Sequence, residues 1–195
     1  MAPSRKSRRN GFPQLIGVIH LPPLGDAPGG KGRSASELLD KAGSWAVSEA
    51  KLLARAGFDG VILENFGDAP FYADAVPPET IASLSLISAG VMQAAPELAL
   101  GINVLRNDAR AALGIASSLG LPFARINVLS GVAAGDQGWL LGRAAELLRI
   151  RARLGADSGA PWICADVHVK HAQTLHSDRI EQAVDDLAHR ALADA

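Results

Sequence analysis

The clearest pattern in the chain is a fivefold alternation of short apolar runs with longer amphipathic segments. Apolar runs of about four to eight residues bounded by glycine, proline or asparagine are typical of buried β-strands. The runs occupy residues 15–21, 60–65, 99–105, 123–129 and 162–171. They predict five strands, the first of which ends at His20 because Pro22 and Pro23 follow it.

In the segments between these runs, apolar residues recur at helical spacing. Ser34 and Glu37 form a capping-box signature that starts the first helix, and Gly57 ends it after about Ala56. Asn107 is the predicted N-cap of the helix over residues 109–119. The remaining helices are predicted over residues 77–95, from about 138 to 154, and from about 178 onward.

Uninterrupted alternation of strand and helix implies parallel strands joined by right-handed crossovers. The predicted fold class is therefore α/β. With 195 residues, 48% of them hydrophobic and 20% charged, the chain can form one substantial core. We expect one domain over residues 15–195, preceded by a disordered basic tail over residues 1–14.

Net charge, the lengths of the apolar runs and the cysteine content indicate which binding partners and which cellular compartment to expect. The net charge of −1 gives no electrostatic reason to expect nucleic-acid or membrane binding, and no apolar run reaches the ~18 residues of a membrane helix. The single Cys164 excludes an intrachain disulfide. The basic tail lacks the apolar region of a secretory signal, so we expect a cytoplasmic protein.

Residues 162–171 are the most unusual run, because polar and apolar side chains alternate along it. Cys164, Asp166, His168 and Lys170 would share one face of a strand, and the other face would be wholly apolar. A strand covered on both faces is normally hydrophobic throughout, so this polar row suggests a functional face. A half-exposed edge strand with a solvated face is the alternative.

Polar residues also fall where the other strands end. Ligands bind at the carboxyl ends of parallel strands, both in barrels and in open sheets. We therefore predict a site in which Asp166, His168 and Lys170 are catalytic. The predicted binding residues are His20, Glu64, Asn65, Asn103, Arg106, Asn127 and His171.

The chemistry that these residue types support is broad. Asp166 and His168 could act together as a general base, and Lys170 could stabilise an enolate or a phosphate, or form a Schiff base. A divalent metal on His20, Glu64, Asp166 and His168 is a further possibility, but the spacing matches no metal motif, and we predict none. Phosphate-loop and nucleophile-elbow motifs are absent from the sequence, and the cofactor is left open.

Several longer motifs resemble the BtpA/SgcQ family, whose members are predicted (β/α)8 barrels of the ribulose-phosphate-binding type. The resemblance covers about residues 15–195. It rests on residues 19–24, 64–71, 78–80, 101–108, 125–131, 136–138 and 166–172. Two positions depart from the family pattern: Leu24-Gly25 shortens a Leu-Pro-Gly motif, and His168 stands where an acidic residue is expected.

The resemblance implies a TIM-type barrel, of which this chain would supply about five βα units. An eight-unit barrel needs roughly 250 residues. We therefore expect a C-terminally truncated barrel whose open strand edges are covered by self-association or by a partner.

Two functions follow from these expectations. The first is an enzyme, or the remnant of one, that acts on a small and possibly phosphorylated metabolite at the strand ends. The second, implied by the family name, is a non-catalytic assembly or stability factor of the photosystem I biogenesis type. The convergence of polar groups favours the enzyme.

Overall fold

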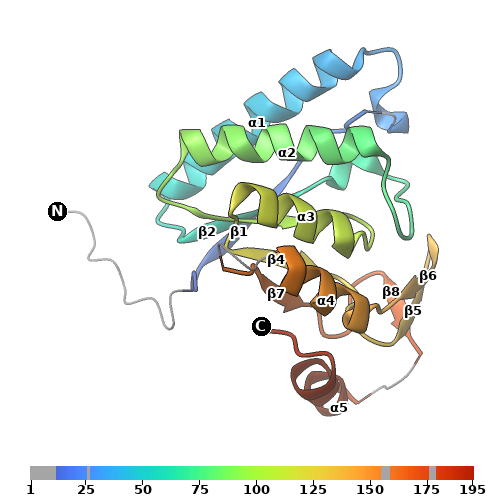
Figure 1. The fold of residues 1–195 in the computed structure, drawn as a ribbon. Coiled ribbons are helices and arrows are strands. Elements are labelled where there is room, and N and C mark those ends of the chain that lie inside the picture. The colour runs from blue at the N-terminus through green and yellow to red at the C-terminus, as the bar shows by residue number, and fades with distance from the viewer. Residues whose placement is uncertain (1–11, 26, 155–158, 176–178) are drawn as a thin grey trace.

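The computed structural model describes residues 12–25, 27–154, 159–175 and 179–195. Its centre is a five-stranded parallel sheet in the order β1-β2-β3-β4-β7, which is also the order along the chain (Figure 1). The expected basic tail lies almost entirely outside the described residues. The five strands are β1 (Ile16–His20), β2 (Gly60–Glu64), β3 (Ala99–Asn103), β4 (Phe123–Ile126) and β7 (Trp162–Ala165).

Helices connect the strands and continue in chain order after the last one. Right-handed crossovers between successive neighbouring strands place the four helices that connect them on the same face of the sheet. The α/β class is thereby confirmed. The helices are α1 (Ala35–Arg55), α2 (Pro78–Ala94), α3 (Ala109–Leu119), α4 (Ala144–Leu154) and α5 (Ile180–Asp185), which a π-helical turn (Asp186–Arg190) extends.

Local sequence accounts for the helix ends. The capping box at Ser34 is confirmed, because its hydroxyl accepts from the Glu37 amide and the Glu37 carboxylate accepts from the Ser34 amide. Asn107 was predicted to cap α3, and this is wrong. Asp108 is the cap, since its carboxylate accepts from the Ala111 amide at 2.9 Å and also from the Val76 amide.

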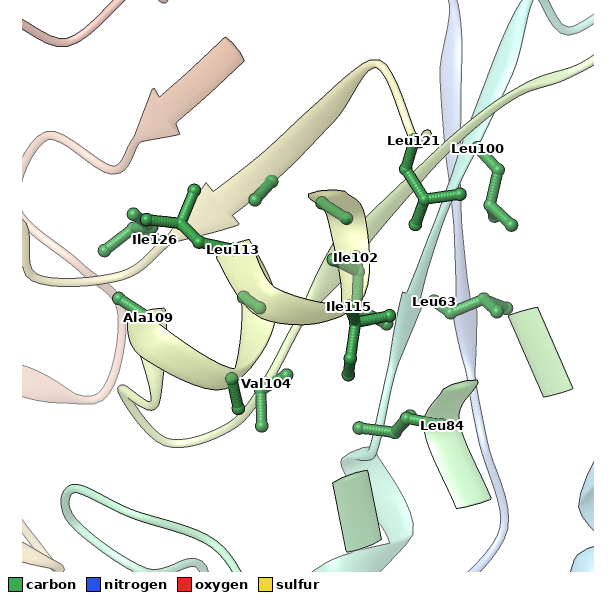
Figure 2. Close-up of a cluster of buried hydrophobic side chains, with 14 of the residues drawn as sticks. Leu63, Leu84, Leu100, Ile102, Val104, Ala109, Leu113, Ile115, Leu121 and Ile126 are labelled. Atoms are coloured by element: carbon green, nitrogen blue, oxygen red, sulfur yellow. The ribbon is translucent and has the colours of Figure 1, made fainter. Parts of the chain in front are cut away.

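The core lies between the sheet and its helices. The strand register aligns one residue from each strand into an apolar row on the helix side: Ile19, Leu63, Ile102, Ala124 and Ile163. All five are at most 2% exposed. Figure 2 shows part of this core, where Leu63 and Ile102 lie near Leu84 of α2 and Ile115 of α3.

A second, smaller sheet lies at one end of the parallel sheet (Figure 1). It is antiparallel, with the order β6-β5-β8. Its strands are β5 (Val132–Gly135), β6 (Gly138–Leu141) and β8 (Ala172–Thr174). Asp136 and Gln137 form the two-residue turn of the β5–β6 hairpin, for which Gly138 adopts a φ of +98°.

This small sheet overturns two predictions. The helix predicted from about residue 138 begins at Ala144, because Leu140 is buried between exposed Trp139 and Leu141, which is the alternation of a strand. The strand predicted over residues 162–171 ends at Ala165. His168 and His171 have φ values of +53° and +60°, so the chain turns and pairs β8 with β5 instead.

Aromatic side chains pack at the other end of the parallel sheet. The Phe12 ring stacks on Trp162 with centroids 5.0 Å apart and meets the edge of Phe123 at 5.1 Å. Gly101 makes room for Phe123, since a Cβ at this position would lie 2.2 Å from its ring. The sheet is therefore filled with apolar groups at this end, whereas the strand ends near the small sheet carry polar groups.

No helix of the described part of the chain is both long and apolar enough to cross a membrane.

Candidate ligand-binding site

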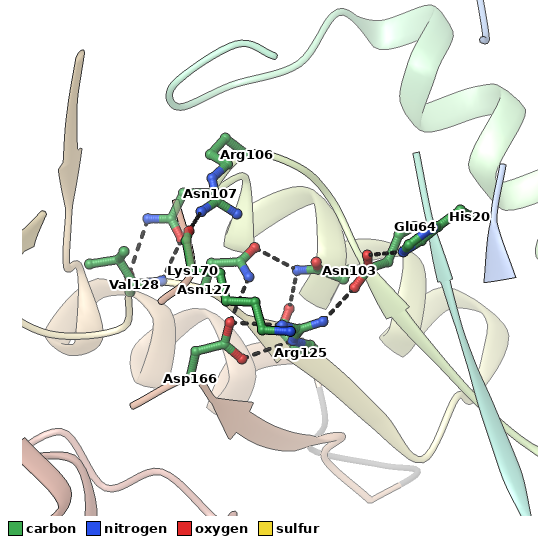
Figure 3. Close-up of polar contacts among 10 residues, drawn as sticks. All are labelled: His20, Glu64, Asn103, Arg106, Asn107, Arg125, Asn127, Val128, Asp166 and Lys170. Carbon is green, nitrogen blue, oxygen red and sulfur yellow. Dashed lines mark hydrogen bonds and ion pairs between the residues drawn. The ribbon is translucent and has the colours of Figure 1, made fainter. Parts of the chain in front are cut away.

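The register that aligns the apolar row also aligns the neighbouring residues on the opposite face. His20 pairs with Glu64, and Glu64 pairs with Asn103. Further along the sheet, Arg125 of β4 pairs with Cys164 of β7. Side chains from β1, β2, β3 and β4 therefore meet at one rim, as Figure 3 shows.

A cavity of about 570 Å³ opens at this rim. Parts of its wall come from the parallel strands, from the loops after β2 and β3, and from the small sheet, which contributes Asp136 and Gln137. Seven of the ten predicted site residues line it: His20, Glu64, Asn103, Arg106, Asn127, Lys170 and His171. The volume is within the range of pockets that hold small molecules.

Arg125 lies at the centre of the polar network. Its Nε and Nη2 donate to the two oxygens of Asp166 at 2.8 and 2.9 Å, and its Nη1 donates to Glu64 Oε1 at 2.7 Å. The bond to Asp166 and the nearby carboxylates raise the pKa of Arg125, against the effect of burial. One guanidinium thus bridges two carboxylates that are both largely buried.

Glu64 and His20 form a pair at the edge of the cavity. His20 Nε2 lies 3.4 Å from Glu64 Oε2, and the imidazole stacks on Phe66 with centroids 4.2 Å apart. Burial raises the pKa of Glu64 above its ordinary value, although Arg125 and His20 act in the opposite direction. A buried carboxyl group of raised pKa beside an imidazole is suited to proton transfer.

A chain of side-chain hydrogen bonds runs from Asp166 to Asn103. Asn127 Nδ2 donates to Asp166 Oδ2 at 2.9 Å, and Asn127 Oδ1 accepts from Asn103 Nδ2 at 3.1 Å. Asn103 Nδ2 also donates to the Arg125 carbonyl at 2.8 Å. Because an ionised carboxylate only accepts, it fixes the orientation of both amides.

Cationic groups line another part of the wall. Arg106 is 7% exposed, and burial lowers its pKa from the ordinary value. Its guanidinium donates to the carbonyl of Lys170, and among the described residues no carboxylate lies within ion-pair distance of it. Lys170 and His171 are exposed and complete this side of the cavity.

Three predicted site residues lie outside the cavity wall. Asn65 joins two loops, because its Oδ1 accepts from the Leu105 amide at 2.7 Å and its Nδ2 donates to Asp68 at 3.0 Å. Asp166 lies behind Arg125, and both of its oxygens accept from neighbouring side chains. His168 faces a separate void of about 30 Å³, where its Nε2 is buried without a partner.

The row of Cys164, Asp166, His168 and Lys170 predicted along one strand face does not form, since the strand ends before Asp166. Burial, and secondarily the carboxylate of Asp194, raises the pKa of Cys164 to about 12. The thiol is therefore protonated at neutral pH and is a poor nucleophile.

Sequence reasoning missed seven cavity residues: Phe66, Phe71, Leu105, Arg125, Asp136, Gln137 and Val169. A signal for Arg125 was available, because it lies two positions before Asn127 in a run predicted to be a strand and so shares its face. Asp136 and Gln137 could not be found in this way, since their run was assigned to a loop and a helix.

The described residues contain no group of three or more His, Cys, Asp or Glu side chains arranged to hold a metal ion. The groups that are present can bind an anion at Arg106 and transfer a proton at Glu64 and His20.

The fold and the site define an α/β protein with a cavity at the carboxyl ends of parallel strands. The model of the BtpA family matches residues 13–195, and the chain belongs to this family. It is 46% identical over 181 residues to an uncharacterized protein of Pyrococcus horikoshii, covering 93% of this chain and 65% of that protein.

Two further relatives extend the comparison. The photosystem I biogenesis protein BtpA of Synechocystis is 44% identical over 180 residues, which cover 92% of this chain and 60% of the relative. An uncharacterized protein of Caenorhabditis elegans is 31% identical over 183 residues, covering 92% and 63%. The chain thus spans less than two thirds of the length of these relatives.

Proposed function

We propose that the cavity at the rim of the parallel sheet binds a small anionic metabolite and that the protein is an enzyme or a part of one. The observation that carries this proposal is Arg106, a buried cation that lines the cavity and has no carboxylate within ion-pair distance among the described residues. A buried charge normally has a partner, and a ligand carboxylate or phosphate would provide it.

Lys170 would add positive charge beside the same anionic group and His171 would add a ring N–H donor, both from exposed positions that line the cavity. Glu64 and His20 would exchange a proton with the ligand, since they lie together on the wall and Glu64 has a raised pKa. Asp166 would act as a positioning residue, because it holds Arg125 and Asn127 in place. His168 would affect the site only through its loop.

We further propose that the parallel sheet is part of a (β/α)8 barrel. The support is that strand order follows chain order, so that the four connecting helices lie on one face and the polar rim lies on the other. In addition, Ala195 makes both hydrogen bonds of a parallel ladder around Cys164, one to the Ile163 carbonyl and one from the Ala165 amide. Further units, or another chain, would then cover the edges of β1 and β7.

A screen of phosphorylated and carboxylated metabolites by ligand-induced thermal stabilisation tests the binding proposal. A ligand at 100 times its Kd adds about 2.7 kcal/mol to the free energy of unfolding. Arg106→Met should abolish the stabilisation by any anionic hit. Arg143→Met is the matched control, since Arg143 pairs with Asp74 and Glu146 outside the cavity. Stabilisation that survives Arg106→Met would contradict the proposal.

The alternative is an assembly factor, and it rests on the name of the Synechocystis relative, which is a photosystem I biogenesis protein. Under this alternative the cavity residues would be dispensable. Function of the full-length Synechocystis relative after replacement of the residues matching Arg106 and Glu64 would distinguish the two, because only the enzyme requires them.

A further inference from the structure

Two side chains that line the cavity each carry a buried oxygen atom without a hydrogen-bond partner. The atoms are Asn103 Oδ1, from β3, and Gln137 Oε1, from the β5–β6 turn. Asn103 is 1% exposed. A buried acceptor that lacks a donor costs about 1–3 kcal/mol, so both atoms call for a donor from within the cavity.

The orientation of the Asn103 amide is set by its neighbours. Its Nδ2 lies 2.8 Å from the Arg125 carbonyl and 3.1 Å from Asn127 Oδ1, both of which are acceptors. Rotating the amide by 180° would place Oδ1 against these two oxygens. Asn127 cannot turn to accommodate the change, because its own Nδ2 donates to Asp166. The oxygen of Asn103 is therefore fixed as an acceptor, and among the described residues it has no donor.

We propose that Asn103 and Gln137 recognise hydroxyl groups, so that the ligand is a polyhydroxylated molecule carrying one anionic group. This inference rests on the anion-binding role proposed for Arg106 and names the class of ligand. Arg106 would hold the phosphate or carboxylate, and the two amide oxygens would accept from hydroxyls on the carbon chain. The rings of Phe66 and Phe71 would contact its C–H groups.

Such a site discriminates strongly against a ligand that lacks the hydroxyls. Without them both acceptors remain unpaired in the occupied cavity, where water is displaced. The discrimination depends on Asn103 and Gln137, whereas the attraction of the anionic group depends on Arg106. The two contributions can therefore be separated by experiment.

The test uses two pairs of probes with matched carbon chains. D-sorbitol 6-phosphate and n-hexyl phosphate share a six-carbon chain and a phosphate and differ in their hydroxyls. D-gluconate and hexanoate form the same pair with a carboxylate. Calorimetric titration of the full chain should show binding of the hydroxylated member at least about tenfold tighter in one pair or both, and the pair that binds identifies the anionic group.

Substitutions then locate the preference. In Asn103→Leu the ratio between the two members of a pair should fall by about tenfold, while the affinity for the alkyl member stays within about threefold. Gln137→Met, in the β5–β6 turn, should lower the ratio severalfold and serves as a second variant if Asn103→Leu does not fold. Ser88→Ala is the matched control, because it removes another unpaired buried oxygen from α2, which does not line the cavity.

The outcomes separate this inference from the proposal beneath it. Equal affinity of the wild-type protein for both members of each pair, with binding still abolished by Arg106→Met, would overturn hydroxyl recognition and leave the anion site intact. Undiminished affinity for the hydroxylated member in Arg106→Met, with its preference over the alkyl member intact, would overturn the anion site alone. Absence of binding by all four probes would overturn both.

Discussion

Two rows of side chains lie one position apart on the same strands and have opposite surroundings. Ile19, Leu63, Ile102, Ala124 and Ile163 face the helices and are almost completely buried. The next row is His20, Glu64, Asn103, Arg125 and Cys164, and the first four of these line the cavity. Because side chains alternate along a strand, a single register places both rows at once.

The difference lies in how each row is stabilised. The apolar row gains free energy from leaving water, at about 25 cal/mol per Å² of buried surface. The polar row loses hydration and recovers it only through mutual pairing, with Arg125 between Glu64 and Asp166. Its members therefore hold one another in position, and the unpaired groups that remain, Arg106 and the oxygen of Asn103, are those available to a ligand.

The largest expected loss of stability comes from shortening a side chain of the apolar row. Leu63→Ala should lower the free energy of unfolding by about 3 kcal/mol, because it removes buried methyl groups and leaves a cavity under α2 and α3. Urea denaturation measures the change. Val18→Ala on the other face is the control, since Val18 is 43% exposed, and it should change stability by less than about 0.5 kcal/mol. Similar losses for both variants would show that the two faces do not differ.

A smaller loss is expected from breaking the polar row at its centre. Arg125→Met leaves Glu64 and Asp166 without their shared cation, and we expect a loss of about 2 kcal/mol at neutral pH. The loss should shrink on acidification, as the two carboxylates become protonated and no longer need the cation. Urea denaturation at several pH values measures it. The control Arg143→Met removes an exposed pair and should cost less than about 0.5 kcal/mol. A loss that does not depend on pH would contradict the ionic explanation.

The apolar row was predictable from sequence, and much of the polar row was as well. As expected, β1, β2 and β3 end in His20, Glu64 and Asn103, because apolar runs closed by Gly, Pro or Asn mark both the strand and its end. The strands β4 and β7 end one residue before Asn127 and Asp166. Boundaries were accurate where a residue type determines them, as at Ser34, where side chain and backbone cap each other, and at Gly120, whose left-handed backbone ends α3.

The small sheet escaped prediction because its strands are only three or four residues long. Trp139, Leu140 and Leu141 match a strand and the start of a helix equally well, and only the pairing with β5 decides between them. The alternation in residues 162–171 was misleading for a related reason. Alternating polar and apolar residues predicted one long strand over this run. In the structure β7 ends at Ala165, and the chain then turns so that β8 pairs with β5, a distant segment of the chain. Non-local pairing is the information that a local pattern lacks.

Asn65 tests whether a residue at the rim has a structural role or a ligand-binding role. Asn65 was predicted to bind the ligand, but it is 1% exposed, and its amide bonds the Leu105 backbone and Asp68. Asn65→Ala should therefore lower the free energy of unfolding by about 1.5 kcal/mol, because a buried backbone amide loses its acceptor. Thermal and urea denaturation measure this loss. Asn103→Ala is the comparison, because it should weaken ligand binding more than it lowers the free energy of unfolding. If instead Asn65→Ala mainly weakened binding and Asn103→Ala mainly lowered stability, Asn65 would be the binding residue and Asn103 the structural one.

The smallest expected effect concerns the ionisation of Glu64. Burial raises its pKa above the ordinary value of 4.5, so the folded state binds this proton more tightly than the unfolded state does. Its contribution to stability is complete below pH 4.5 and is lost as the pH rises through the raised pKa. Glu64→Gln carries no charge and cannot lose this contribution. The stability of Glu64→Gln relative to wild type should therefore increase as the pH rises over that interval, as urea denaturation at a series of pH values would show.

Glu37 is the control for this prediction, because its pKa is shifted in the opposite direction. Hydrogen bonds from Ser34 lower the pKa of Glu37, so its contribution is present above pH 4.5 and is lost as the pH falls through the lowered value. Glu37→Gln should accordingly become less stable relative to wild type as the pH rises. Opposite slopes for the two variants would show that burial at the polar row governs Glu64. The absence of a slope for Glu64→Gln would show that Arg125 compensates fully for the burial of this carboxylate, and parallel slopes would show that it overcompensates.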